Sequence, residues 1–258
     1  MPEHSTWLTL LLAYMRETLD QNASALGDSV VGHHSPTWRS FEPLFAALLT
    51  ATIVIFLALR TRSRLDRVDE AVIPEDRLTL RTFMETFLAY FYDLAKSVMG
   101  PERAKRYFPV IGTSAMFVFF SNVMALIPGM PVATSHLNVT LGCALVVFVF
   151  FNAYGLSVQG SAYIKHLAGP VWWLAPLLFP LEVLSLCIRP ATLAVRLMVN
   201  MAADHIMLGL FLSLIALLVP VPVMLLGCLV VVVQTLVFTL LTCIYIGLAT
   251  EGHDEHAH

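Results

Sequence analysis

Four charged side chains interrupt a long apolar stretch in the last third of the chain, residues 171–250: Glu182, Arg189, Arg196 and Asp204. Each charge would cost about 2.5–3.5 kcal/mol at the centre of a lipid bilayer, so such groups face water or another protein. Their chemistry is proton transfer and ion pairing, because carboxylates take up and release protons whereas a guanidinium keeps its charge at every workable pH.

Most of the polar groups share one face of the helix that this stretch predicts. At about 100° per residue, and without a kink at Pro190, four polar side chains fall within about 40° of Arg196: Glu182, Ser185, Arg189 and Asn200. Asp204 falls about 80° away, and the opposite face is Leu, Val, Met and Ile. Such a stripe predicts the wall of an aqueous path or a polar contact with another protein.

The order of these residues suggests two proton relays separated by a fixed cation. If the helix enters from the inner side, Glu182 and Ser185 lie nearer that side, and Asp204 and His205 lie nearer the outer side. Asp and His pass protons at workable pH, and Arg does not. Arg196, between them, would block straight-through flow and attract a carboxylate from a neighbour. The simpler alternative is that Arg196 pairs with an acid of its own chain and holds helices together.

The composition requires lipid as the solvent for much of the chain. Of its 258 residues, 58% are hydrophobic and only 13% are charged, whereas soluble domains carry about 25% charged residues. The net charge of −3 offers no basic surface for nucleic acid. The four cysteines lie in apolar runs without metal-ligand spacing, so neither a metal site nor a disulfide framework is expected.

We therefore predict an all-α membrane protein with five or six membrane helices and no strands. Uncharged runs long enough to span the membrane occupy 43–59, 107–164 (two passes) and 206–250. The expected organisation is as follows: an outer N-terminal segment (1–42), a first membrane helix (43–61), a cytoplasmic loop with an amphipathic helix (62–106), two membrane helices (107–165), a tilted hairpin (166–250) and a cytoplasmic tail (251–258).

The basic residues set the expected orientation. Ten of the 15 Lys and Arg residues lie between Arg60 and Arg106, so the positive-inside rule places this segment in the cytoplasm and the N-terminus outside. Within it, 80–99 carries aromatic and aliphatic residues at helical spacing with interleaved charges, which predicts an amphipathic helix on the inner surface.

The last two helices are too long for an upright bundle. From Trp172 to Pro220, one helix would measure about 70 Å, against a hydrocarbon core of about 30 Å. Strong tilt, with bends at the prolines, is expected. A hairpin centred on Val221 would set Gln234 opposite Leu208, and a pairing of Gln234 with Arg196 requires the first helix to end well before Pro220.

The residues around Arg196 resemble subunit a of the F-type ATP synthase. Its Arg-Leu-x-x-Asn-Met context appears as Arg196-Leu197 and Asn200-Met201, with Glu182 upstream and the basic-Pro pair Arg189-Pro190 between. Gln234 and Phe238 fit a Gln-x-x-x-Phe setting of the last helix. Further resemblance lies in Asn138-Val139-Thr140-Leu141 and in Gly32-His33-His34, so the likeness covers most of the chain and favours a bacterial inner membrane.

The resemblance implies a stator subunit that couples proton translocation to rotation of a ring of c subunits. Arg196 would meet the ring carboxylates and separate two aqueous half-channels, with these path residues: Glu182, Ser185, Asn200, Asp204, His205 and Gln234. Additional candidates are Arg189, Gly227 and Tyr245, the last also typical of an aromatic belt. Implied partners are the c-ring, the b subunits of the peripheral stalk and, indirectly, the soluble catalytic sector. No phosphate-binding loop of the Gly-x-x-x-x-Gly-Lys type occurs, so no catalytic activity alone and no cofactor are expected.

Two positions depart from the family pattern, in which a Gly is followed by Glu or His, and a His or Glu precedes the Gln by seven residues. Here these positions hold Asp204-His205 and Gly227. We hypothesise that the acid at Asp204 compensates for the partner missing at Gly227. Two rival functions remain: a secondary transporter with its site near Arg196, which should show internal repeats, and a non-transporting membrane scaffold.

Overall fold

The computed structural model describes residues 14, 41–65, 79–127, 130, 133–160, 175–214 and 220–250. The expected N-terminal segment with Gly32-His33-His34, most of the loop after the first span and the C-terminal tail lie outside these residues. So does the side chain of His205, although its backbone is helical.

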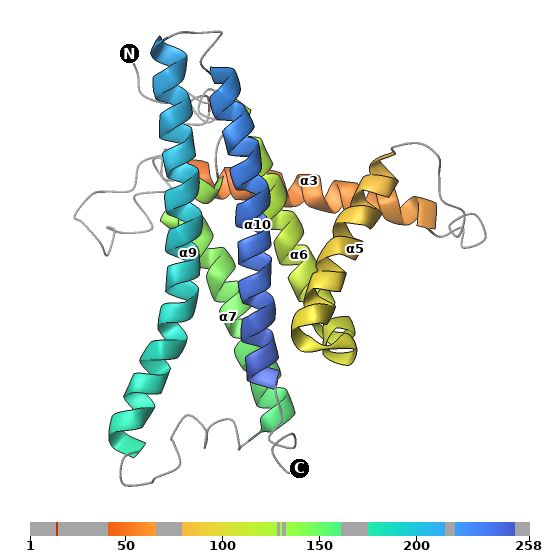
Figure 1. Cartoon of the computed structure of the whole chain (residues 1–258), viewed down its shortest axis with the longest axis vertical. Helices are drawn as coiled ribbons and strands as arrows, with labels where there is room; N and C mark the ends of the chain where they lie inside the picture. Colours follow the sequence, from red (N-terminus) through yellow and green to blue (C-terminus); the bar gives the residue numbers. More distant parts are fainter. Residues whose placement is uncertain are drawn as a thin grey trace. The chain divides into compact units, whose positions relative to one another are not determined.

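The described residues are helical and contain no strand, which confirms the all-α prediction. Figure 1 labels the elements in chain order: α3 (Glu42–Leu65), α5 (Leu80–Met99), α6 (Pro101–Ala125), the 3-10 turn η2 (Ala133–Ser135), α7 (Leu137–Gln159), α9 (Ala175–Leu214) and α10 (Pro220–Thr250). Five helices among the described residues are long and apolar enough to cross a membrane: α3, α6, α7, α9 and α10.

The amphipathic sequence of α5 gives a helix with the bounds that its spacing predicts, Leu80–Met99. Thr79 caps its N-terminus by accepting the Thr82 N–H at 3.4 Å. Gly100 ends it with φ of 83°, a left-handed conformation that glycine adopts without a Cβ penalty, and donates its N–H to the Lys96 carbonyl. The chain can thus turn at once into α6, which begins at Pro101.

The long helix α9 continues through Pro180 and Pro190 over 40 residues, a length of about 60 Å. The residues of the predicted polar stripe therefore lie on one continuous helix. It ends at Leu214, and α10 begins at Pro220. Residues 215–219 lie outside the described residues, so the pairing of Arg196 with Gln234 stays a prediction.

Contacts divide the chain into two compact units that cut across these helices. The first unit comprises 1–55, 117–140 and 197–232, and the second comprises 56–116, 141–196 and 233–258. In the second, a buried cluster joins five helices: Ala95, Met99, Ala104, Tyr107, Ile111, Phe151, Leu186, Cys243, Ile246 and Ala249. In the first, Thr50 of α3 donates to the Met124 sulfur of α6 at 3.3 Å.

Candidate functional site

Arg196 lies on α9 with its side chain exposed. Its neighbours Val195 and Val199 are large exposed apolar residues, whereas Leu193 and Leu197 are buried. Among the described residues of its unit, no acid forms an ion pair with Arg196, Glu182 included. The ion pair within the chain that a purely structural role of Arg196 would require is absent from this part of the chain.

The other polar groups upstream on α9 differ in exposure. Ser185 is exposed and Glu182 is half-buried. Arg189 is half-buried, with its guanidinium carbon 5.7 Å from the centroid of the Tyr245 ring on α10. The Tyr245 ring in turn lies 6.2 Å from the ring of Phe151, which is fully buried. Tyr245 therefore holds a cation inside the protein, a contact that its position in the sequence did not reveal.

We predict that Tyr245→Leu weakens the second unit. A cation over an aromatic face contributes about 0.5–2 kcal/mol, and that energy is lost with the ring. The midpoint temperature at which the detergent-solubilised complex loses this subunit should fall. Tyr245→Phe keeps the ring and should leave the midpoint close to wild type. Equal midpoints for the Leu and Phe variants would show that the contact contributes nothing.

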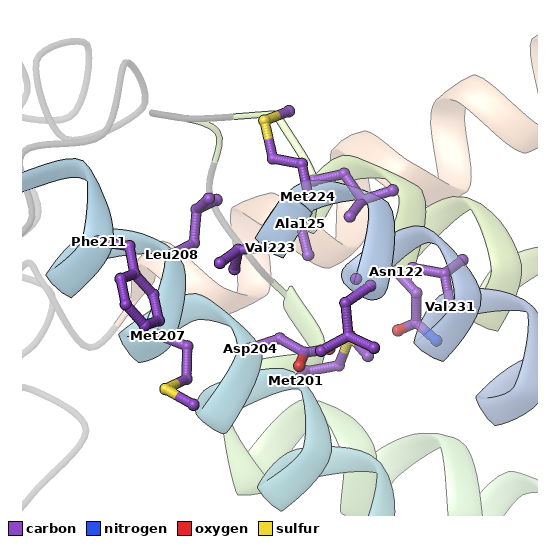
Figure 2. Close-up of a pocket in the computed structure, with 13 residues that line it drawn as sticks. Asn122, Ala125, Met201, Asp204, Met207, Leu208, Phe211, Val223, Met224 and Val231 are labelled. Atoms are coloured by element: carbon purple, nitrogen blue, oxygen red, sulfur yellow. The ribbon is translucent and has the colours of Figure 1, made fainter. Parts of the chain in front are cut away.

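A cavity of about 120 Å³ lies in the first unit, where α6, α9 and α10 meet. Its polar lining residues are Asn122 of α6 and Asp204 of α9, and the others are apolar or glycine (Figure 2). A cavity needs only about 10–15 Å³ to hold one water, provided that polar partners are present. The space is therefore large enough for several waters between an amide and a carboxyl group.

Asn122 is the cavity residue that the sequence analysis missed. Its side chain is 0% exposed, and its Oδ1 accepts a hydrogen bond from the Thr134 hydroxyl at 3.0 Å. Among the described residues its Nδ2 has no hydrogen-bond partner, and an unsatisfied buried donor costs about 1–3 kcal/mol. A water in the adjoining cavity would remove that cost. The sequence does show an amide side chain within an apolar run. It does not show which residues surround that side chain, because tertiary packing sets them.

Gly227 and Asp204 line the same cavity. A Cβ at position 227 would lie 2.9 Å from the Leu126 Cδ2 atom, so any larger side chain requires Leu126 to move. The absence of a side chain at 227 thus leaves room for the close packing of α10 beside the chain that follows α6. The two positions that depart from the expected family pattern adjoin one space.

Gln234 is 3% exposed and Asn200 is half-buried. Gln234 belongs to a polar series on α10 that is buried inside the second unit, with Thr235, Thr239 and Thr242. The hydroxyls of Thr239 and Thr242 bond to carbonyls of the preceding turn, at 2.8 and 2.9 Å, which satisfies them within the helix. Among the described residues no group of three or more His, Cys, Asp or Glu side chains could hold a metal ion.

Known proteins resemble this chain over most of its length. A family model described as ATP synthase A chain matches residues 44–247. ATP synthase subunit a of Sorangium cellulosum is 57% identical over 99% of this chain and 100% of its own length. ATP synthase subunit a 1 of Syntrophotalea carbinolica is 46% identical over 69% and 74% of the two chains. ATP synthase subunit a of Bdellovibrio bacteriovorus is 37% identical over 81% and 92%.

Proposed function

This chain belongs to the ATP synthase A chain family, and from that premise we propose that it provides two aqueous half-channels and an essential arginine that couple proton flow to rotation of a c-ring. It is a membrane component of the ATP synthase complex, with bacterial relatives and five helices able to span. Nucleotide chemistry belongs to other subunits of that complex.

The observation that carries the proposal is the state of Arg196. Its charge stands exposed on a helix long enough to cross a bilayer, and no acid among the described residues of its unit pairs with it. Lipid is an expensive environment for such a group. A carboxylate on an adjacent subunit of the complex would relieve that cost. We assign this partner to the c subunits, each of which would present an acid in turn.

The cavity at Asp204 supports an outer half-channel. Protons move along chains of water and titratable groups, and the cavity offers room for water beside a carboxyl group. The joint lining by Asp204 and Gly227 supports the hypothesis that the acid on α9 replaces one missing from α10. His205, Asn200 and Gln234 would continue this path toward Arg196.

Glu182 and Ser185 would line the inner half-channel, with Ser185 exposed and Glu182 half-buried on the same helix as Arg196. The fixed charge of Arg196 would keep the two paths apart, because an arginine releases no proton at workable pH. A proton must then be carried by a carboxylate of the ring, and this transfer is coupled to rotation of the ring. The concentration of basic residues in 60–106 supports a cytoplasmic location for that segment and for the C-terminal tail.

An isosteric change at Asn122 tests the outer path. Asn122→Leu removes the amide group that lines the cavity, and we expect ATP-driven proton pumping in inverted vesicles to fall about tenfold, the equivalent of one lost hydrogen bond of about 1.4 kcal/mol. Ser121→Ala is the matched control, because Ser121 is equally buried and also has no hydrogen-bond partner among the described residues, but it does not line the cavity. Equal pumping by both variants would contradict this path.

A further inference from the structure

A second cavity, of about 270 Å³, lies in the other unit, at the end of α3 and the start of α5. It is lined by Arg60, Thr61, Thr79, Leu80 and Arg81. Two guanidinium groups thus border one space, and none of the described residues that line it is acidic. The hydroxyls of Thr61 and Thr79 also border it but already bond to Leu57 and Thr82. This chemistry suits a phosphate group, which arginine binds through paired N–H donors.

Arg81 is the buried residue of this lining, with 8% of its surface exposed. Its Nε donates to the Glu85 carboxylate at 2.7 Å, one helical turn further along α5. Because a guanidinium is planar and carries five N–H donors, a bond at Nε fixes the plane of the whole group. Arg81 is therefore held in a defined orientation at the wall of the cavity, unlike a mobile surface arginine.

The start of α5 adds to the positive potential. Thr79 caps this 20-residue helix, and the N-terminal end of a helix carries a partial positive charge that favours anions. Arg60 contributes an exposed cation from α3. Glu85 pairs with Arg81, and Arg60 adds a second guanidinium to the lining of the cavity.

The cavity also lies where a lipid headgroup would be. Thr61 lies at the end of the candidate membrane span of α3, Glu42–Thr61. On α5, three large apolar side chains next to and beyond the cavity are exposed, Leu80, Phe83 and Tyr90. Basic pockets between helices at the membrane surface bind the headgroups of acidic lipids. An apolar exposed face beside a basic cavity matches an amphiphile that carries a phosphate and acyl chains.

We propose that this cavity binds the phosphate group of an anionic phospholipid, with the acyl chains against the apolar surface of α5. Inorganic phosphate shares the chemistry of the headgroup but has no acyl chains. The site is separate from the proton path, so proton pumping is not its readout. Its expected effect is a lipid held at this place in the complex.

A photoactivatable phosphatidylglycerol tests the proposal in the purified, assembled complex. After illumination, mass spectrometry quantifies lipid attached to residues 80–99 of this chain. We expect Arg60→Gln to lower this labelling about fivefold, since one basic residue near a membrane surface contributes about 1 kcal/mol to binding. Arg60 is exposed, so its replacement leaves the Arg81–Glu85 pair in place. Arg106→Gln is the matched control, because Arg106 is exposed on α6 and does not line the cavity.

Three outcomes decide the matter. Selective loss of labelling in Arg60→Gln, together with weak labelling by a photoactivatable phosphatidylcholine, supports the site. Binding of inorganic phosphate to the wild type without labelling by the anionic lipid supports a phosphate site but overturns a lipid as its source. Equal labelling in the wild type, Arg60→Gln and Arg106→Gln overturns the proposal.

Discussion

Replacing Arg196 with Ala should abolish ATP-driven proton pumping while the complex still assembles. At an effective dielectric constant of about 20, an arginine and a carboxylate about 4 Å apart attract by about 4 kcal/mol. Loss of that energy corresponds to about a thousandfold in rate, which is below detection in a vesicle assay. Since Arg196 is exposed and no acid among the described residues of its unit pairs with it, its removal should leave the fold intact.

The same variant should leak protons passively once the catalytic sector is stripped from the vesicles, because the fixed charge no longer separates the two paths. Arg196→Lys keeps the charge but loses the planar fork of donors, so it should pump poorly and leak less than Arg196→Ala. Val195→Ala, at the exposed neighbouring position, is the matched control and should pump like wild type. Pumping by Arg196→Ala at wild-type rates would favour a scaffold role.

Asp204→Asn should lower proton pumping by about 100-fold, the lower end of the range for loss of a group that transfers protons. An amide has nearly the shape of a carboxyl group but takes up no proton. Asp204→Glu is the matched control and should keep most of the activity, because the cavity of about 120 Å³ has room for one more methylene. Pumping is measured as acidification of inverted vesicles, normalised to the amount of assembled complex.

A transfer of the acid to α10 tests whether Asp204 compensates for Gly227. Asp204→Gly with Gly227→Glu should restore pumping relative to Asp204→Gly alone, when Leu126→Ala is added to make room for the new side chain. The third change is needed because a Cβ at 227 lies 2.9 Å from Leu126. Unchanged pumping in Asp204→Asn would dispose of the hypothesis directly, because no compensating acid would then be required.

Local features of this molecule could be predicted well from sequence. The spacing of apolar residues predicted the helix at Leu80–Met99 with the bounds that the structure gives, because amphipathic periodicity and the glycine after it are local signals. The family followed from residues near Arg196, since charged groups in an apolar run are rare and their spacing is specific.

Features that depend on packing between distant segments could not be predicted. The cavity beside Asp204 exists because α6, α9 and α10 meet. Asn122 of α6 lines it only because the fold brings α6 next to α9 and α10. Tyr245 was also interpreted as a possible interfacial aromatic residue, and only the structure shows Arg189 over its ring. The prolines of α9 predict bends, and the helix is continuous through Pro180 and Pro190, because neighbouring groups can compensate for the lost bonds in membrane helices.

Site-specific photocrosslinking from α9 tests most directly whether Arg196 faces the ring. A photoreactive residue at Val195, which is 46% exposed, should form adducts with the c subunit in the assembled complex, whereas one at Leu193, 2% exposed, should form none. Adducts from Val195 to c subunits, lost when the ring is removed, are the result that this account predicts. An assembled complex in which Val195 crosslinks only to lipid or to its own chain would contradict it.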